Sequence, residues 1–439
     1  MLSRGSMTRR RFLGTAAALA APTVVPGVAL GADGTTAPSN QIGVGMIALG
    51  RQAIGRNLPV FLRHPLSRVV ALCDVDRWRL ERTRGQEGLN DCFCTTDFRE
   101  VLDRKDVDAV MITTPDHSHV TIALAAIRAG KDVCCEKPIG LCIEHGRILA
   151  DAVAKAGCVF RTDSEFRSIP TFFKAVSLVR TGKIGQVKAI RMAVPLWNEP
   201  LPMQPEMPVP EELDYDVWLG PAPAAPYTEK RVHPRKDYGR PGWYANRTYC
   251  DGVISNWGYH PADIAQWGNN SERTGPVEIE GRGDFPPADG LWNVMLGFNV
   301  RYRYADGVEL FYTALTDRSK GQSYVRFEGT EGWICVWYGP DRLEAEPASV
   351  LTAEVSSDEF PFLCKNEKHD FLDCIKSRSR TLQDAEVGHR SSSIGQLGYI
   401  ACQVGRKLTW DPAAERFAGD DEANALLSLP PGRAPWNVG

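Results

Sequence analysis

The sequence predicts a two-domain protein: a doubly wound α/β domain with a parallel sheet, then an α+β domain with a mostly antiparallel, open sheet. Three observations lead to this prediction. Strand and helix patterns alternate over short connections from Ile42 to Gly157, which is typical of parallel sheets. A glycine-containing turn joins the first strand to the first helix. From about Val159, consecutive β-rich segments replace the alternation.

The elements of the first domain follow from short apolar runs and from stop signals. We predict strands at 42–47, 69–73, 109–113 and 133–135, because each run is apolar and is closed by a turn or a polar residue. We predict helices over 51–64, 97–102, 120–129 and 143–156. Asp97 is a suitable N-cap for the second of these helices, and Gly130 and Gly157 end the last two.

The second domain combines helices with β-rich segments. Helical periodicity is found at 172–179, 368–377 and 389–408, and the β-rich segments are 187–194, 294–304, 309–314, 324–328 and 333–337. A proline-rich, aromatic stretch, 195–241, follows the first of these β-rich segments. Because long non-repetitive loops inside compact domains tend to be functional, we expect this stretch to contribute to a site.

Length and composition limit the classes of function. With 439 residues, of which 43% are hydrophobic and 24% charged, the chain has ordinary globular composition and room for two or three domains. A formal net charge of -3 gives no general attraction to nucleic acid or to anionic membranes. We divide the chain into an export signal (1–32), a linker (33–40), the first domain (41–158) and the second domain (159–439).

The N-terminus has the features of an export signal. Thr8-Arg9-Arg10-Arg11-Phe12-Leu13 places paired arginines before an apolar stretch that runs to about Leu30 and ends in small residues. This pattern is typical of the twin-arginine signal, which carries folded proteins across the bacterial inner membrane. A disordered basic tail would explain the charge but not the apolar run. We expect a periplasmic or otherwise exported protein that uses the twin-arginine machinery and has no membrane span after processing.

The cysteines predict reduced thiols rather than a disulfide framework. The chain has twelve of them, and several lie inside apolar runs, as Cys73, Cys134 and Cys402 do. Such thiols fit a protein that folds in the reducing cytoplasm before export. Cys92-Phe93-Cys94 has neither a second cysteine pair nor a nearby histidine, so we predict no metal site.

The turn Gly45-Met46-Ile47-Ala48-Leu49-Gly50 predicts a dinucleotide site. Glycine there lets backbone N–H groups and a helix N-terminus approach a pyrophosphate, although Ala48 stands where a third glycine is expected. Asp74, at the end of the second strand, can accept hydrogen bonds from an adenosine ribose and repels a 2′-phosphate. NAD is therefore favoured over NADP. NADP stays possible, because Arg77 or Arg79 could hold its additional phosphate.

Two further motifs hold residues suited to proton transfer. Glu136-Lys137-Pro138 ends a parallel strand, at the edge where doubly wound sheets bind ligands, and a lysine beside a nicotinamide suits acid/base chemistry. Asn256-Trp257-Gly258-Tyr259-His260 can place an imidazole in a cleft with little bulk around it. Taken singly, Lys137 could equally be an exposed turn lysine and His260 a structural histidine.

Together and in this order, these motifs resemble the glucose-fructose oxidoreductase / inositol dehydrogenase / rhizopine-catabolism (Gfo/Idh/MocA) family of NAD(P)-dependent sugar and polyol enzymes. The likeness runs from about Ile42 to Trp436 and includes the loop 114–119. The stretches 214–221 and 371–376 are similar to an exported bacterial branch of the family. The resemblance implies a Rossmann-type first domain, with Lys137 and His260 as the catalytic acid/base pair.

The motifs and the resemblance also indicate which residues bind. For the cofactor we expect Gly45, Ala48, Leu49, Gly50, Asp74, Thr114, Pro115, His119, Glu136 and Lys137. For the substrate we expect Arg167, Asn256, Trp257, Tyr259 and His260. The family often has aspartate in place of Asn256, and glycine in place of Ala48 and Asp251. Since an amide cannot act as a base, we expect Asn256 to hydrogen-bond a substrate hydroxyl or His260. The open sheet commonly pairs face to face in this family, which implies a homo-oligomer.

Three functions agree with these residues. The leading hypothesis is hydride transfer between a sugar, polyol or glycoside and a dinucleotide, with Lys137 or His260 taking the hydroxyl proton. The dinucleotide should be tightly bound, because the periplasm has no replenished pool of free NAD. Some relatives resembling this branch instead hydrolyse glycosides through NAD, by oxidation, elimination, hydration and reduction. A non-catalytic sugar-binding protein is the third function, and the presence of both Lys137 and His260 argues against it.

Overall fold

The computed structural model describes residues 40–196, 199–315, 322–339, 342–361 and 364–436. The export signal predicted at 1–32 lies outside these residues, and so does the predicted linker except for its last residue. The chain divides into two compact units, residues 1–41 and 42–439, and the sheets and helices described below belong to the second unit.

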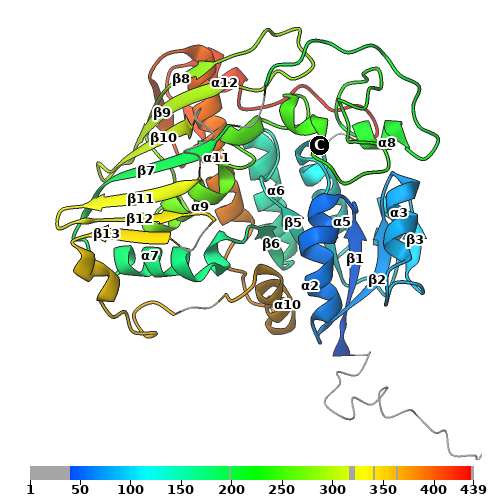
Figure 1. The fold of residues 1–439 in the computed structure, drawn as a ribbon, viewed down its shortest axis with the longest axis horizontal. Coiled ribbons are helices and arrows are strands. Elements are labelled where there is room, and N and C mark those ends of the chain that lie inside the picture. The colour runs from blue at the N-terminus through cyan, green and yellow to red at the C-terminus, as the bar shows by residue number, and fades with distance from the viewer. Residues whose placement is uncertain (1–39, 197–198, 316–321, 340–341, 362–363, 437–439) are drawn as a thin grey trace, which may run out of the picture. The chain divides into compact units, whose positions relative to one another are not determined.

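The second unit begins with a six-stranded parallel sheet, drawn in blue to teal in Figure 1. The strand order is β3-β2-β1-β4-β5-β6, and every neighbouring pair is parallel. The strands are β1 (Ile42–Ile47), β2 (Ser67–Cys73), β3 (Phe93–Thr95), β4 (Ala109–Ile112), β5 (Asp132–Glu136) and β6 (Phe160–Asp163). The order reverses between β1 and β4, and doubly wound sheets bind ligands beyond the carboxyl ends of their strands at such a point.

Helices cover both faces of this sheet, which explains why its strands are continuous apolar runs. The helices are α2 (Leu58–Arg63), α3 (Arg77–Arg84), α4 (Phe98–Leu102), α5 (His119–Arg128) and α6 (Ile143–Ala156). Residues of α4, α5 and α6 form one apolar cluster with the sheet, and residues of α2 and α3 form another. Every residue of β1, β4 and β5 is buried, as expected of a sheet covered on both faces. The predicted doubly wound α/β class is confirmed.

The parallel sheet extends past the domain boundary predicted at residue 158. β6 pairs with β5 from Val133↔Phe160 to Glu136↔Asp163, so residues 160–163 belong to the first domain and not to the second. The sequence-based prediction lacks both β3 and β6. These strands have three and four residues, which is too short for a periodic pattern to separate a strand from a connecting loop.

The rest of the unit is built on a nine-stranded sheet with the order β13-β12-β11-β7-β10-β9-β8-β14-β15. Its strands are β7 (Val187–Pro195), β8 (Glu278–Asp284), β9 (Gly297–Arg303), β10 (Glu309–Leu315), β11 (Tyr324–Gly329), β12 (Trp333–Trp337), β13 (Arg342–Glu346), β14 (Leu408–Asp411) and β15 (Arg416–Phe417). β7 and β10 pair in parallel, and the other described pairs are antiparallel. This confirms the predicted α+β class of the second domain.

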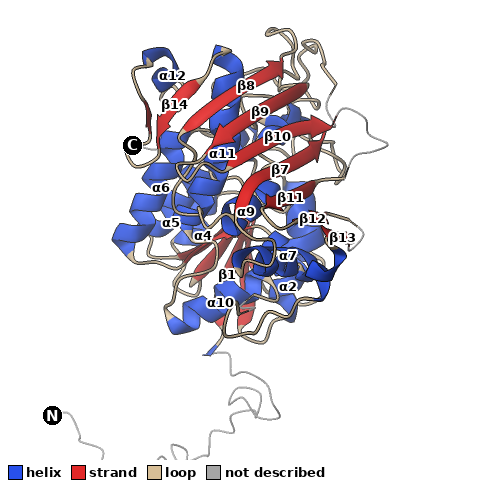
Figure 2. Cartoon of the chain, turned by 90° about the vertical axis from the view of Figure 1, so that its left-hand side faces the viewer, coloured by secondary structure: helices blue, strands red, loops and turns tan. Residues whose placement is uncertain are grey.

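Helices cover one face of the nine-stranded sheet (Figures 1 and 2). These helices are α7 (Pro170–Arg180), α9 (Tyr259–Gly268), α11 (Ala385–Val404) and the short α12 (Asp421–Ala425). In contrast, α10 (Glu367–Ser377) packs against β5 and β6 of the parallel sheet, and the short α8 (Tyr215–Leu219) packs beside Val75 of the first domain. Burial alternates along β9 and β10, as expected when one face of a sheet packs on a core and the other is open. Because α11 also packs against α6, the C-terminal part of the chain returns to the first domain.

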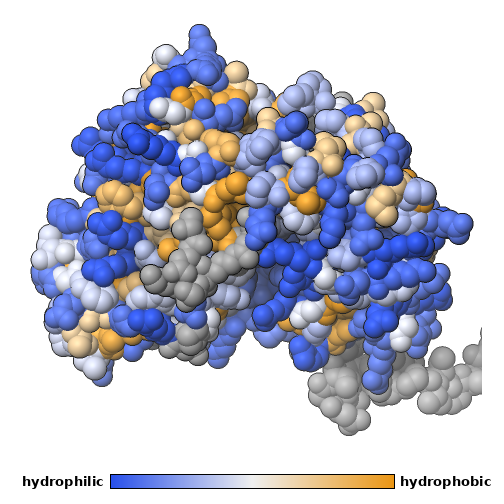
Figure 3. Space-filling view, turned by 45° about the horizontal axis from the view of Figure 1, so that its top comes forward, coloured by the Kyte–Doolittle hydropathy of each residue, from blue (hydrophilic) through white to orange (hydrophobic). Residues whose placement is uncertain are grey.

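The thiols and the surface agree with the globular composition of the chain. All twelve cysteines are free, ten of them buried and two half-buried, which confirms the predicted reduced thiols. The face shown in Figure 3 is mostly hydrophilic, and its hydrophobic residues lie in small patches. In the part of the chain that the structure describes, no helix combines the length and the apolar character needed to cross a bilayer.

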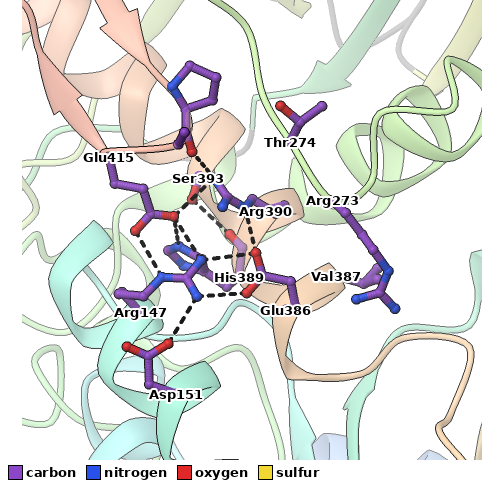
Figure 4. A network of polar contacts seen from close by, with 12 residues as sticks. Arg147, Asp151, Arg273, Thr274, Glu386, Val387, His389, Arg390, Ser393 and Glu415 are labelled. Atoms are coloured by element: carbon purple, nitrogen blue, oxygen red, sulfur yellow. Dashed lines mark hydrogen bonds and ion pairs between the residues drawn. The ribbon is translucent and has the colours of Figure 1, made fainter. Parts of the chain in front are cut away.

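A network of ion pairs fastens α6 to α11 and to the turn between β14 and β15 (Figure 4). Arg147 on α6 donates to both oxygens of Glu386 on α11, at 2.7 and 3.0 Å, and to both oxygens of Glu415, at 3.1 and 2.9 Å. His389 Nε2 lies 2.7 Å from Glu415, and Arg390 donates to Glu386 at 2.8 Å. Burial raises the pKa of both carboxyls, but these side-chain hydrogen bonds outweigh it and lower each pKa to about 2.

We expect the Glu415→Gln variant to be destabilised at neutral pH but not in strong acid. A carboxyl whose pKa is lower in the folded state stabilises the fold above its unfolded pKa, here 4.5, and this contribution is lost as the pH falls towards about 2. The variant should lose about 2 kcal/mol of unfolding free energy at pH 7 and little near pH 2. Urea unfolding at both pH values measures this difference. Glu422→Gln removes an exposed partner of Arg406 and is the control, with an expected loss below about 0.5 kcal/mol. Equal losses for Glu415→Gln at both pH values would contradict the prediction.

Candidate active site

The glycine motif 45–50 lies partly inside β1 and partly in the turn that follows it, where the sequence places that turn. Gly45 lies inside β1, where an added Cβ would come within 2.6 Å of the Val101 side chain, and Leu49 is fully buried. The left-handed residue of the turn is Ala48, at φ 69°, a conformation that favours glycine. The turn therefore comprises Ala48 to Gly50. Of the four residues predicted here, Ala48 and Gly50 line the cleft described below, and Gly45 and Leu49 do not.

Asp74 follows the last residue of β2, at the carboxyl edge of the sheet, as predicted. Its carboxylate accepts hydrogen bonds from the backbone N–H of Leu49 at 2.6 Å and of Asp76 at 2.8 Å. Burial raises the pKa of Asp74, and Arg79 and the two N–H donors act against this rise. The acid thus holds the turn after β1 and the start of α3 together at one edge of the cleft.

A cleft runs along the carboxyl edge of the parallel sheet. Ala48, Gly50, Asp74, Thr114 and Pro115, all predicted to bind the cofactor, line it from the first domain. The lining residues from the second domain and the C-terminal segment are Val217, Trp218, Gly220, Pro221, His233, Gly239, Pro241, Trp243 and Trp436. An open turn between strand and helix, an acid at the end of the second strand and apolar walls are what a dinucleotide requires. The residues present therefore fit a nicotinamide dinucleotide.

The segment 212–233 is fastened to the first domain beside this cleft. The backbone N–H of Asp214 donates to the carbonyl of Val75, and that of Arg77 donates to the carbonyl of Glu212, both at 2.9 Å. His233 Nε2 lies 3.1 Å from the Asp76 carboxylate. These contacts make the proline-rich, aromatic stretch part of the cleft, in agreement with the expectation that it contributes to a site.

A second pocket adjoins the cleft and holds the predicted catalytic pair. Arg51, Gln52, Thr113, Thr114, Pro241 and Trp243 line both cavities. The pocket also contains the predicted residues His119, Glu136, Lys137, Asn256, Trp257 and His260. Asp116, Glu165, Arg240 and Tyr244 complete its lining. The end of β5 and the start of α9 thus bring Lys137 and His260 to one cavity next to a dinucleotide-sized cleft.

Lys137 is bound to Asn256. Its Nζ donates to the side-chain Oδ1 of Asn256 at 2.9 Å and to the backbone carbonyl of the same residue at 3.0 Å. Nδ2 of Asn256 donates to both oxygens of Asp116, each at 2.8 Å. Among the described side chains, the hydrogen-bond partners of the Asn256 amide are therefore Lys137 and Asp116. Of the two partners predicted for Asn256, a substrate hydroxyl or His260, the structure does not show the bond to His260.

His260 lies at the beginning of α9 and is 2% exposed. Its Nδ1 is 2.7 Å from Ser164 Oγ and 3.7 Å from the carboxylate of Glu165, and its ring stacks on Phe166. Gly258, two residues earlier, packs closely on Tyr312, because a Cβ there would lie 1.8 Å from the Tyr312 hydroxyl. Burial and then the positive charge of Lys137 lower the pKa of His260 well below its ordinary value. The imidazole is therefore neutral near pH 7 and able to accept a proton.

Four of the residues predicted to bind cofactor or substrate instead make contacts within the protein. Arg167, 1% exposed, donates to both oxygens of Asp263 at 2.8 and 2.7 Å and to the Leu382 carbonyl, and it lies outside the pocket lining. Tyr259 is also buried outside that lining. The two nitrogens of His119 lie 2.9 Å from backbone carbonyls, and Glu136 accepts a hydrogen bond from Asn57. The structure thus gives Arg167 and Tyr259 packing positions rather than the predicted substrate contacts.

Sequence reasoning missed Ser164 and Glu165. Both follow β6 at the edge where Lys137 follows β5, because Glu136 pairs with Asp163 in the sheet register. Burial raises the pKa of Glu165, although its side chain remains 35% exposed. Recognising Phe160–Asp163 as a parallel strand would have placed both residues at the site, since the carboxyl ends of parallel strands meet at one edge.

Comparison with known proteins identifies two matching family models. Residues 42–164 match the oxidoreductase family, NAD-binding Rossmann fold, and residues 196–438 match the oxidoreductase family, C-terminal alpha/beta domain. Levoglucosan dehydrogenase of Pseudarthrobacter phenanthrenivorans is 35% identical over 97 residues, which are 22% of this chain and 25% of that protein. Inositol 2-dehydrogenase of Klebsiella pneumoniae is 34% identical over 114 residues, 26% of this chain and 33% of that protein. The matched segments span less than half of these relatives.

Solved structures share the fold over most of the chain. Aldose-aldose oxidoreductase from Caulobacter crescentus, complexed with glycerol, superposes with a TM-score of 0.62 at 19% identity and covers 84% of this chain and 99% of that one. The WlbA dehydrogenase from Bordetella pertussis, in complex with NADH and UDP-GlcNAcA, gives a TM-score of 0.64 at 15% identity over 84% and 99% of the two chains. These likenesses concern the fold, whereas the second family model covers more than half of the sequence by itself. The chain therefore belongs to the Gfo/Idh/MocA oxidoreductase family.

Proposed function

We propose that this protein is an exported NAD(P)-dependent oxidoreductase that acts on a sugar, polyol or glycoside and keeps its dinucleotide bound. The observation that carries the proposal is the meeting of Lys137 and His260 in a pocket that opens into a dinucleotide-sized cleft. Levoglucosan dehydrogenase, inositol 2-dehydrogenase and 1,5-anhydro-D-fructose reductase, each of which resembles this chain over part of its length, are named for such substrates.

The two catalytic side chains divide the proton chemistry. A bound nicotinamide supplies the hydride acceptor, and it must be restored by a second sugar, by an external acceptor or by the same sugar. Lys137, held at Asn256, places its ammonium in the pocket, where it can donate a hydrogen bond to a substrate oxygen. His260, neutral because of its burial and of Lys137, can take the hydroxyl proton as the carbon is oxidised. The aromatic rings of Trp243, Tyr244 and Trp257 offer apolar walls for a sugar ring.

Retention of the dinucleotide is supported by the wall that the second domain adds to the cleft. Lining residues between Val217 and Trp243, together with Trp436, form one side of the cleft, and the contacts of Asp214, Arg77 and His233 tie this wall to the first domain. Because these contacts hold that side of the cleft in place, a ligand that fits it binds to a preformed site, and we propose slow release of the dinucleotide. We propose NAD rather than NADP, because the carboxylate of Asp74 in the cleft repels a 2′-phosphate.

The dinucleotide is expected to survive purification at close to one per chain. The test is to denature dialysed protein with acid and with alkali and to assay the supernatants for NAD and NADH. The intact protein is then incubated with free sugars and with nitrophenyl glycosides, without added NAD. Bound dinucleotide that a sugar reduces supports the proposal. Protein that is empty after dialysis and active only with added NAD would refute tight binding, and protein that reduces no dinucleotide under either condition would refute the activity.

The position of Glu165 favours one second candidate, a redox-neutral glycosidase. In that reaction C3 of the glycoside is oxidised, the C2 proton and the leaving group are eliminated, water adds and the hydride returns to C3. These steps need an acid/base group in addition to the pair used for the oxidation. Glu165 lines the same pocket, 3.7 Å from His260, and its pKa is raised by burial. Release of nitrophenol with no net reduction of the bound dinucleotide distinguishes this candidate from the first.

Export and self-association complete the proposal. The twin-arginine segment lies in residues 1–39, outside the described part of the chain. Replacing Arg9 and Arg10 together with lysine is expected to leave unprocessed protein in the cytoplasm, and processed variant in the periplasm would refute the twin-arginine route. For the open face of the nine-stranded sheet we propose contact with a second copy, supported by half-buried Phe311, Tyr324, Trp333 and Trp337. A monomer by light scattering would refute that contact.

A further inference from the structure

We propose that Asp116 is a positioning residue for Lys137 and acts through Asn256. Asp116 fixes the amide of Asn256 so that its oxygen, and not its NH₂ group, faces the ammonium. The inference rests on the proposed function insofar as Lys137 is taken to be the lysine that meets the substrate. The arrangement of the three side chains is nevertheless a property of the protein by itself and can be tested without a substrate.

The hydrogen bonds leave the amide one orientation. Both oxygens of Asp116 accept from Nδ2 of Asn256 at 2.8 Å, and a carboxylate cannot donate to the amide oxygen. Asp116 is 2% exposed and Asn256 is 5% exposed, so little water reaches either group to replace these bonds. With Nδ2 directed to Asp116, Oδ1 is directed to Nζ of Lys137, at 2.9 Å. The backbone carbonyl of Asn256 accepts a second N–H of the ammonium at 3.0 Å.

The two hydrogen-bond acceptors that hold Lys137 are therefore the neutral oxygens of Asn256. The carboxylate of Asp116 bonds to the amide of Asn256 and not to Lys137 itself. Two of the three N–H groups of Lys137 are used by Asn256, and the side chain lines the pocket. An amide oxygen orients the ammonium, but it favours the charged form less than a carboxylate at the same distance would. This relay, which runs from Asp116 through Asn256 to Lys137, thus fixes the position of the ammonium in the pocket.

The other titratable groups around Lys137 come from three further elements. Glu136 precedes it at the end of β5, Glu165 follows β6, and His260 begins α9. His119 lines the same pocket from the start of α5. All of these groups stay in place in the variants below, so a change at Lys137 can be traced to Asp116 and Asn256.

The test measures how readily Lys137 reacts with trace acetic anhydride as a function of pH, by peptide mass spectrometry on the purified holoprotein. Only the unprotonated amine reacts. Lys131 is a matched internal control, because its Nζ likewise donates to two neutral carbonyl oxygens, in this case the backbone carbonyls of Arg104 and Val107, at 2.8 Å. Asn256→Asp places a carboxylate against the ammonium, and labelling of Lys137 at a fixed pH near 8 should fall by about ten- to hundredfold. Asp116→Asn should raise it several-fold, since the buried charge is lost and the amide is free to turn.

The reciprocal exchange, Asp116→Asn with Asn256→Asp, keeps one carboxylate and one amide in the relay but moves the charge next to Lys137. It should label as slowly as Asn256→Asp alone, with Lys131 unchanged throughout. If Asp116→Asn does not fold, Asn256→Asp and the exchange still decide the question. Labelling of Lys137 that is the same in all folded variants would refute the relay and leave Asp116 a purely structural tie. A Lys137 that takes no label in the wild type at high pH, where Lys131 does, would refute an ammonium open to the pocket. Neither result depends on whether a sugar is oxidised.

Discussion

The Lys137→Met variant is expected to lose turnover by about 10³- to 10⁴-fold while it keeps its fold and its dinucleotide. Methionine has nearly the length of lysine but no N–H donor, so the pocket stays filled while the bonds to Asn256 and to a substrate oxygen are lost. Lys137 belongs to the pocket lining and not to that of the dinucleotide cleft. The measurement is the turnover of whichever sugar or glycoside the wild type converts, together with the dinucleotide content of the acid and alkali extracts.

Two further variants define what this loss means. His260→Ala removes the proton acceptor and should lower turnover by about 10²- to 10⁴-fold. Because the pKa of His260 lies well below its ordinary value, the neutral form persists into mild acid, and wild-type activity should fall only when the pH drops towards that low pKa. Lys155→Met changes an exposed lysine on α6 and should leave turnover unchanged. Wild-type rates in Lys137→Met or His260→Ala would show that the site is assigned to the wrong pocket.

The fold class and the placement of Lys137 and His260 in one pocket could be predicted because their signals are local. Apolar runs separated by helical stretches indicate a covered parallel sheet, and the structure has that sheet. Lys137 directly follows a parallel strand, and this alone places it at the ligand-binding edge of the sheet, independently of the structure of the second domain. His260 lies two residues after Gly258, whose missing side chain makes room at the start of α9.

Residue roles and tertiary contacts could not be predicted from the same patterns. The strand 42–47 and the turn that begins at Ala48 lie where the sequence predicts them, but the roles within the motif differ: Gly45 is required by packing against Val101, and Ala48 adopts the left-handed conformation that glycine usually occupies. Arg167 has the composition of a substrate ligand, but its partner Asp263 is almost a hundred residues away in the sequence. The relay from Asp116 to Lys137 likewise joins a loop of the first domain to a residue of the second, and no spacing rule predicts such a contact.

Lys368→Met is expected to cause the largest loss of stability, about 3–5 kcal/mol of unfolding free energy. Nζ of Lys368 lies 2.7 Å from the carboxylate of Asp163 and 2.9 Å from that of Glu367, and its side chain is 3% exposed. Burial lowers the pKa of Lys368, but Asp163, Glu367 and Glu136 outweigh this and raise it. The ammonium is therefore charged in the folded protein, and its removal leaves buried carboxylates without their cation. Urea unfolding of the variant and the wild type measures the loss.

The pH dependence separates this explanation from a simple packing defect. Burial raises the pKa of Asp163 to about 7 even with Lys368 beside it. A carboxyl whose folded pKa exceeds its unfolded value destabilises the fold as the pH rises, and loss of the cation strengthens that effect. The deficit of Lys368→Met should therefore grow between pH 6 and pH 9, as more of the buried acid must ionise without a partner. Lys365→Met, three residues away and exposed, should change the unfolding free energy by less than about 0.5 kcal/mol at either pH. A deficit that is the same at both pH values would mean that the methionine merely packs badly and that the ion cluster is not what stabilises this side of the site.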